Sequence, residues 1–356
     1  MGVTYADQLA GKDDAVRRIL ADAVPSGAWL DPYASKESGF RNKAKLAVGG
    51  TIDTPTLGIL DRGGAGVDLR ECGLYEPGLR GVLPRLARFV TDARLSPYEL
   101  ATKRGELKNL LITRAPSGSL MVRFVLRSQE AIARIRKHLP ALIDDLPQIE
   151  VVSANIHPEH KAVLEGDLEI PLSDVEALPM TLGTITLYLR PQSFFQTNTE
   201  VAAGLYEQAR EWTTQSGART VWDLYCGVGG FALHLATPDR SITGVETSAE
   251  AIASATLSAK QLAGHLDFVT ADAADYATGH AAPDLAVVNP PRRGIGALAQ
   301  RLEHSDVATV VYSSCNAQSL ARDLAQMPSL HVAQARMFDM FPQTDHHEVM
   351  VLLRRR

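Results

Sequence analysis

The chain has 356 residues, of which 45% are apolar and 22% are charged. This length predicts two or three domains, and the composition is ordinary for a globular protein. The net charge of −5 excludes a polycation. The sequence contains no apolar run of about 18 residues, so no transmembrane helix is predicted. Because the three cysteines are too few for a disulfide framework and the first residues do not resemble a secretory signal, we expect a cytoplasmic protein that does not bind membranes.

The first helix is predicted over residues 6–24, where apolar side chains recur with helical spacing. From residue 36 to about residue 190, short β-rich runs alternate with helical stretches such as 129–139. The β-rich runs include 120–126, 151–156 and 185–189. This mixture predicts an α+β region with an antiparallel sheet.

Basic residues of this first half occur in three clusters. They are Arg41, Lys43 and Lys45, then Lys103, Arg104 and Lys108, then Arg123, Arg127, Arg134, Arg136 and Lys137. Such clusters can form a local positive face without raising the isoelectric point of the whole chain. On charge alone, solvated helix and strand surfaces are the favoured interpretation.

Beyond residue 200 the pattern changes to alternating strands and helices. Five apolar, strand-like runs separated by helical stretches predict a buried parallel sheet. These runs are 220–224, 242–245, 266–269, 285–288 and 307–312. Two further runs, 332–340 and 349–353, have no helix between them. An α/β, doubly wound sheet that ends in an antiparallel pair is typical of class I (Rossmann-like) methyltransferases.

A glycine-rich turn follows the first of these strands, with Asp223 before it and Gly227 and Gly229 within it. Glycines let a backbone approach a ligand closely. Asp223 would repel a phosphate but suits a sulfonium ligand with an amino group, which favours S-adenosylmethionine over NAD. Glu246, at the end of the next strand, is placed to bind ribose hydroxyls, and Asp272 could approach the adenine.

The candidate chemistry lies at the ends of the fourth and fifth strands. Amino-group methyltransferases carry an aromatic residue after Asn-Pro-Pro, but Arg292 stands there, which disfavours amine methylation. Cys315 follows the fifth strand and indicates covalent catalysis, in which a thiolate adds to C6 of a pyrimidine and activates C5. A general base must then remove the C5 proton, and Glu348 is the favoured candidate. The simpler alternative for Cys315 is a buried core cysteine, which is the favoured interpretation of Cys226. The simpler alternative for the run that ends in Glu348 is a solvated turn.

The chain resembles the S-adenosylmethionine-dependent RNA uracil-C5 methyltransferases, and among them the branch that modifies 23S ribosomal RNA. The segments that carry the resemblance are 38–45, 104–108, 123–128, 190–198, 222–231, 288–296, 312–318 and 338–349. The resemblance implies a helical segment over 1–35, a central α+β RNA-binding domain over 36–200 and a catalytic domain over 201–356.

The resemblance also implies roles for single residues. Cys315 matches the nucleophile and Glu348 the base, and the positions that match the cofactor site are Gln196, Tyr225, Glu246 and Asn289. Other branches have Asp in place of Asn289, so the hydrogen bonds there can differ. The implied partner is 23S ribosomal RNA, bound by a monomer at a hairpin loop, where flipping the base costs least. Transfer-RNA uridine, cytosine C5 and a non-catalytic RNA-binding role are the alternatives.

Relatives in this branch usually hold a 4Fe–4S cluster on four cysteines, three of them in an N-terminal segment. Here only Cys72 resembles a ligand, as the cysteine of the central domain. Either the first Met is internal to a longer protein, or the lineage lost the cluster and kept Cys72 as an orphan. The chain as written is expected to hold no cluster and no other metal, and residues 1–15 to be held only by the apolar face of the first helix.

Overall fold

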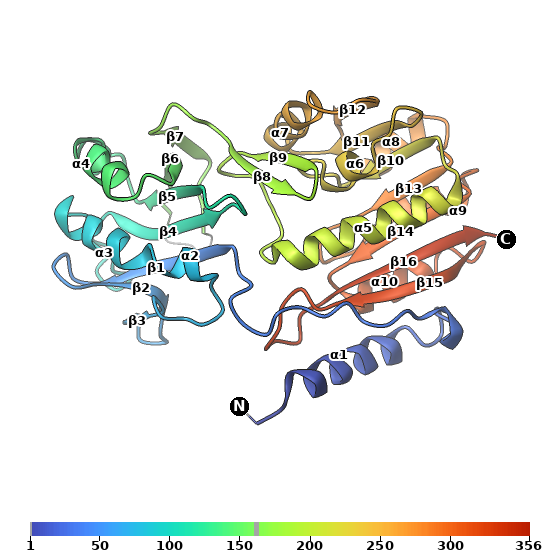
Figure 1. The fold of residues 1–356 in the computed structure, drawn as a ribbon, viewed down its shortest axis with the longest axis horizontal. Helices are drawn as coiled ribbons and strands as arrows, with labels where there is room; N and C mark the ends of the chain where they lie inside the picture. The colour runs from blue at the N-terminus through green and yellow to red at the C-terminus, as the bar shows by residue number, and fades with distance from the viewer. Residues whose placement is uncertain (1, 160–163) are drawn as a thin grey trace. The chain divides into compact units, whose positions relative to one another are not determined.

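The computed structural model describes residues 2–159 and 164–356. The chain forms two compact units (Figure 1). Unit 1 comprises Met1–Glu37, Leu182–Tyr188 and Gln192–Arg356, and unit 2 comprises Ser38–Thr181 and Leu189–Pro191. The first helix and residues 192–200 therefore belong with the C-terminal sheet, whereas the sequence predicted a separate segment over 1–35 and a central domain that extends to residue 200.

Unit 1 contains a seven-stranded sheet in the order β12-β11-β10-β13-β14-β16-β15. Neighbouring strands from β12 to β14 are parallel, and β16 pairs antiparallel with both β14 and β15. The strands are β10 (Thr220–Leu224), β11 (Ser241–Glu246), β12 (His265–Thr270), β13 (Leu285–Val288), β14 (Thr309–Ser314), β15 (Leu330–Phe338) and β16 (Glu348–Arg355). The predicted doubly wound sheet with an antiparallel pair at its end is confirmed.

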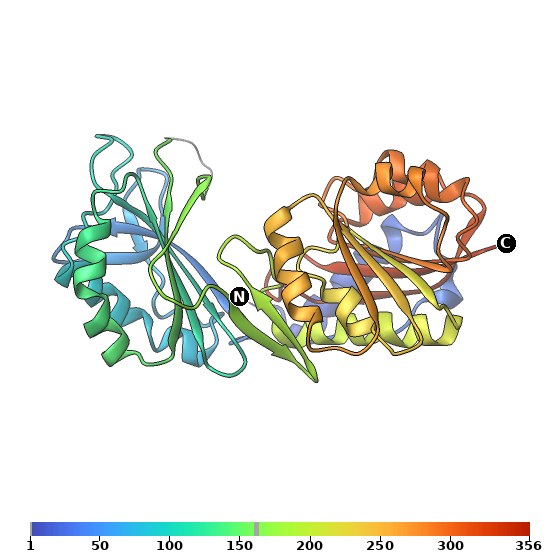
Figure 2. The same cartoon turned by 90° about the horizontal axis from the view of Figure 1, so that it is seen from above.

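Helices lie on both faces of this sheet (Figure 2). They are α5 (Thr199–Ser216), α6 (Gly230–Leu235), α7 (Ala249–Ala259), α8 (Ala273–Gly279), α9 (Ala297–Glu303) and α10 (Ala317–Leu324). Every residue of β13 and β14 is buried beneath them. This explains why these strands read as continuous apolar runs rather than alternating ones.

Unit 2 contains a second seven-stranded sheet, in the order β3-β2-β1-β4-β5-β6-β7, in which only β5 and β6 pair in parallel. Its strands are β1 (Lys43–Gly50), β2 (Pro55–Leu60), β3 (Gly66–Asp68), β4 (Leu107–Arg114), β5 (Leu120–Leu126), β6 (Ile149–Ile156) and β7 (Leu168–Pro171). The helices are α2 (Pro77–Arg80), α3 (Leu83–Asp92) and α4 (Ile132–Asp145). One core packs Leu86 of α3 and Ile135 of α4 against Leu46, Leu110 and Phe124 of the sheet.

A separate hairpin consists of β8 (Leu178–Leu182) and β9 (Ile185–Leu189). Within the described parts of the chain, no helix has the length and apolar character needed to cross a membrane.

The N-terminal helix α1 spans Tyr5–Ile19, shorter than the predicted 6–24, and is capped by Thr4, whose side chain accepts from the Asp7 N–H. A short 3-10 helix, η1, follows at Ser26–Ala28. Contrary to expectation, α1 is not held by its apolar face alone. Lys12 forms a 2.5 Å ion pair with Asp339, and the Tyr5 hydroxyl donates to the same carboxylate at 2.8 Å.

The basic cluster that includes Arg123 is less positive than its sequence indicates. The Arg123 side chain is 2% exposed and forms ion pairs with Glu165 at 2.8 Å and Glu169 at 2.7 Å. Arg127, whose side chain is 40% exposed, pairs with the buried carboxylate of Glu106. Burial would raise the pKa of Glu169, but its hydrogen bonds and ion pair with Arg123 outweigh burial and lower that pKa. Much of this charge therefore serves the fold of unit 2.

Removing Glu169 tests this assignment. Glu169→Ala would leave Arg123 buried with only Glu165 for charge compensation, and breaking a buried pair in this way costs about 3 kcal/mol of unfolding free energy. Urea denaturation followed by circular dichroism measures the loss. The control is Glu130→Ala, which removes an exposed partner of Arg134 and should change stability by less than about 0.5 kcal/mol. Equal effects of the two changes would contradict a structural role for the Arg123 pair.

Candidate active site

The glycine loop after β10 adopts backbone conformations that side chains rarely allow. Gly227 has φ 54° and Gly229 has φ 81°, and Tyr225 also lies at positive φ, 63°. A Cβ on Gly229 would come within 3.0 Å of the Phe268 ring. The Cys226 N–H donates to the Val245 carbonyl at 3.0 Å, which ties the loop to β11. Glycine is therefore required here both for conformation and for close packing.

Asp223 lies fully buried beneath this loop. One carboxylate oxygen, Oδ2, accepts from the Ala232 N–H at 2.8 Å, while Oδ1 is buried without a partner among the described residues. Burial, reinforced by the charge of Glu246, raises the pKa of Asp223 to about 7. The unpaired Oδ1 of Asp223 and its raised pKa fit a site that binds a cationic ligand with a hydrogen-bond donor.

The carboxylate of Glu246 is held in place at the end of β11. Its Oε1 accepts from the N–H groups of Thr247 at 2.7 Å and Ser248 at 3.1 Å, and its Oε2 accepts from Gly227 at 3.3 Å. Asp272, in contrast, is exposed and caps α8 by accepting from the Ala274 N–H at 2.8 Å. Its carboxylate also accepts from the Asp275 N–H at 3.2 Å, so its hydrogen bonds are those of a helix cap.

Asn289 follows β13, and its N–H donates to the Leu224 carbonyl at 3.2 Å, beside the start of the glycine loop. The loop that Asn289 begins is anchored by Asp323 of α10. This carboxylate accepts from the Tyr312 hydroxyl at 2.6 Å and from the Ile295 N–H at 2.9 Å. Asp323 could not be identified from the sequence, because a single acid within a helical stretch gives no signal of its own.

Cys315 and Glu348 are brought together by the pairing of β14 with β16. The register pairs Ser314 with Val349, so Cys315 and Glu348, one step further on, are adjacent across the two strands. Glu348 is buried, and the side chains of Ser313, at 3.4 Å, and Gln196 hydrogen-bond to it. Burial raises the pKa of Glu348 to about 8.

The Cys315 thiol is half-buried, and its environment opposes ionisation in the absence of ligands. Burial raises its pKa, and the neighbouring charge of Glu348 acts in the same direction. Arg292, from the loop after β13, lowers it. The Asn316 side chain donates to the Arg292 carbonyl at 3.1 Å, which connects the two loops that carry these groups. Cys226 is buried, as its interpretation as a core residue requires.

Neither Cys72 nor any group of possible metal ligands among the described residues forms a metal site. Cys72 lies in unit 2 after β3, half-buried against the core of that unit. Among residues 2–159 and 164–356, no group of three or more His, Cys, Asp or Glu side chains could hold a metal ion. The described residues therefore do not fit a cluster with four thiolate ligands.

A doubly wound sheet with a glycine loop after its first strand and acids at the neighbouring strand ends defines a class I methyltransferase. A family model described as tRNA (Uracil-5-)-methyltransferase matches residues 272–356, and one described as Methyltransferase small domain matches 210–311. The 23S rRNA (uracil(747)-C(5))-methyltransferase RlmC of Cronobacter sakazakii is 49% identical over 97% of this chain and 93% of that protein. Its namesake in Serratia proteamaculans is 47% identical over 98% of this chain and 94% of that protein. The chain belongs to the RNA uracil-C5-methyltransferase family, whose methyl donor is S-adenosylmethionine.

The fold agrees with this assignment over the full chain. The crystal structure of the Pyrococcus abyssi tRNA (uracil-54, C5)-methyltransferase in complex with S-adenosyl-L-homocysteine superposes with a TM-score of 0.81 at 24% identity. The match covers 99% of this chain and 84% of that one.

The raised pKa of Glu348 predicts how stability depends on pH. The folded protein holds the Glu348 proton up to about pH 8, whereas the unfolded chain releases it near the ordinary value of 4.5. The unfolding free energy should therefore fall as pH rises between these values. Glu348→Gln removes this contribution, so the difference in melting temperature between variant and wild type should shift in favour of the variant from pH 5 to pH 8. A pH-independent difference would contradict a buried, protonated Glu348.

Proposed function

We propose that the enzyme methylates C5 of a uridine in 23S ribosomal RNA, with Cys315 as nucleophile and Glu348 as general base. The observation that carries the proposal is the adjacency of these two residues at the edge of the sheet where the glycine loop lies. A thiol next to a buried carboxyl is the pair that addition to a pyrimidine and later proton removal require.

The Cys315 thiolate forms a bond from Sγ to C6 of the uracil, which turns C5 into an enolate-like nucleophile. S-adenosylmethionine, when bound, would supply the methyl group that C5 takes up, with S-adenosylhomocysteine as the leaving group. The Glu348 carboxylate takes the proton from C5, the C5–C6 double bond reforms, and Sγ leaves as thiolate. Arg292 favours the thiolate. A pKa of about 8 makes the ionised form of Glu348 a stronger base than an exposed glutamate, and the reaction uses the fraction of the enzyme in which Glu348 is ionised.

The cofactor site proposed for this reaction consists of Asp223, the glycine loop and the next strand ends. Asp223 would receive the amino group through its unmet oxygen, and Glu246 the ribose hydroxyls. Tyr225 and Asn289 flank the loop, and Gln196 joins the cofactor site to the base through its hydrogen bond to Glu348.

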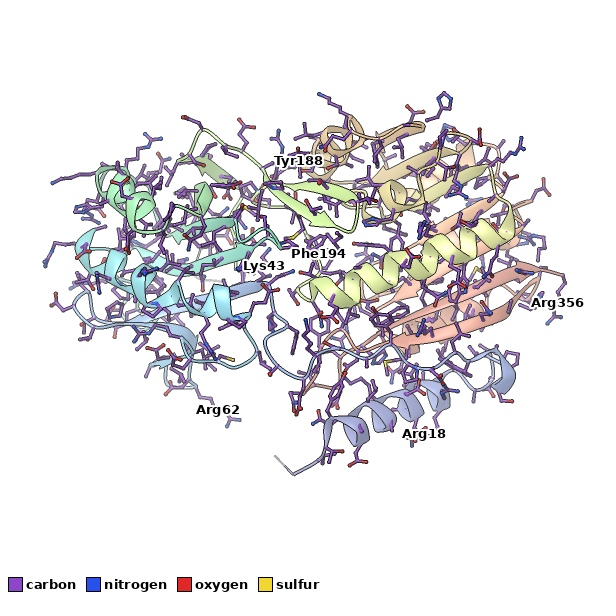
Figure 3. All side chains as sticks on the ribbon, viewed as in Figure 1. Arg18, Lys43, Arg62, Tyr188, Phe194 and Arg356 are labelled. Atoms are coloured by element: carbon purple, nitrogen blue, oxygen red, sulfur yellow. The ribbon has the colours of Figure 1, made fainter. Side chains whose placement is uncertain are left out.

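The proposed RNA substrate is a hairpin loop of 23S ribosomal RNA in the cytoplasm, with unit 2 as the main RNA-binding part and the enzyme acting as a monomer. An unpaired loop makes it easier for the target base to leave its stack and reach Cys315. Phe194, two residues before Gln196, is 71% exposed near the start of α5 (Figure 3) and offers a surface on which a base can stack. Transfer RNA is the second candidate, because the family model and the Pyrococcus abyssi neighbour are both named for it.

Covalent catalysis is tested with Cys315→Ala. This change should abolish methyl transfer to unmodified 23S ribosomal RNA while cofactor affinity, measured by calorimetry, stays near the wild-type value. RNA that contains 5-fluorouridine should trap the wild type as a covalent adduct, because fluorine does not leave as a proton does. Turnover by the alanine variant would refute the mechanism, and methylation of transfer RNA alone would replace the proposed substrate.

The proposed RNA face is tested by charge reversal at exposed positions. Lys43 is unsuitable because burial lowers its pKa to about 8, but Lys45, Lys103 and Arg104 are exposed. Reversing all three to Glu should weaken RNA binding and reduce the slope of log affinity against log salt by about 0.7 for each lost phosphate contact. Arg18→Glu, on exposed α1 (Figure 3), is the control. Unchanged affinity would place the RNA face elsewhere.

A further inference from the structure

The segment that precedes the proposed base has no secondary structure of its own. Residues 339–347 connect β15 to β16, and Glu348 is the first residue of β16. Four consecutive residues of this loop, 343–346, are exposed, and Gln343 has a positive φ of 67°. The loop therefore depends on contacts from other elements for a single conformation.

Lys12 of α1 supplies three of these contacts. Its ammonium group pairs with Asp339 at 2.5 Å and donates to the carbonyls of Phe341 at 3.2 Å and His346 at 3.1 Å. It thus holds both ends of the loop, and its last contact lies two residues before Glu348. The Lys12 and Asp339 side chains are only 8% and 1% exposed, so water does not screen the pair well.

The chain after α1 is attached to the same region. The Leu30 N–H donates to Ala335 at 2.8 Å and the Tyr33 N–H to Met337 at 2.7 Å, so this segment runs along the edge strand β15. Asn198 donates to the Ser35 hydroxyl at 2.8 Å and to the Met340 carbonyl at 3.3 Å. Asn198 lies two residues after Gln196, the residue that hydrogen-bonds to Glu348.

We propose that Lys12 is a positioning residue for proton removal, because it fixes the loop that presents Glu348 to the C5 proton. The inference rests on the proposed function. It assigns a role in the reaction to the N-terminal helix, more than 300 residues away in the sequence. Because Lys12 forms no hydrogen bond or ion pair with Cys315 or the glycine loop within the described part of the chain, its loss should affect the step that uses Glu348 and spare addition and methyl transfer.

The test measures how the methylated intermediate partitions. Labelled methyl groups from S-adenosylmethionine are followed in single turnovers on 23S ribosomal RNA, first in protein-linked RNA and then in free RNA. In Lys12→Met, release should slow by roughly 10- to 100-fold relative to methyl transfer, as expected when a catalytic group is misplaced. Protein-linked RNA should then accumulate, while Lys12→Arg should restore much of the release rate.

Two further variants separate positioning from loss of folding. Lys12→Met combined with Asp339→Asn removes the tie without leaving an unpaired buried charge, and should show the same slow release. Arg17→Met breaks the Asp13 pair on the same helix at 2.7 Å without touching the loop, and should partition as the wild type does. A simple loss of folded protein lowers both steps together and leaves their ratio unchanged.

The outcomes are distinct. If wild type is active and the double variant partitions normally, or if Arg17→Met slows release to the same extent, the positioning role of Lys12 is wrong while the proposed function stands. A wild type that neither methylates 23S ribosomal RNA nor is trapped by 5-fluorouridine RNA would overturn the proposed function and this inference with it.

Discussion

The antiparallel pairing of β16 with β14 is the constraint on which the site depends. A strand inserted between β14 and β15 runs opposite to its parallel neighbours, so its first residue lies at the edge where those strands end. This places Glu348 next to Cys315, although the two residues are 33 positions apart in the chain. Because both strands are buried from the Ser314–Val349 pair to the Val310–Leu353 pair, a shift of register would expose apolar side chains as well as separate the two groups.

Desolvation is the main electrostatic feature of unit 1. Burial raises the pKa of Glu348 to about 8 and of Asp223 to about 7, and it also raises the pKa of the Cys315 thiol. Burial thereby favours the neutral form of each group as long as no charged ligand lies beside it. A sulfonium cofactor and an anionic RNA would each change this balance, so burial couples ligand binding to ionisation at the site.

In unit 2 and at the N-terminus, buried cationic side chains form ion pairs within the fold. Arg123 forms ion pairs with Glu165 and Glu169, and Lys12 binds Asp339 and two backbone carbonyls. Neither is a surface charge available to a partner, although both look like one in the sequence. The segment that carries Lys12 binds a loop that has no hydrogen-bonded ladder, and it belongs to the same compact unit as Cys315 and Glu348.

The sequence by itself determined the order of the strands in the C-terminal sheet and the mixed α+β character of unit 2, because apolar periodicity is a local property that survives without tertiary context. It also identified the glycine loop and the chemical types of Cys315, Glu348 and Asp223, since motifs report which groups are present. Only the tertiary structure decided which of these groups meet. The register of β14 and β16, the tie from Lys12 to Asp339 and the burial of Arg123 all join residues distant in the chain. Such contacts follow from packing and desolvation across the whole unit, which no local spacing encodes.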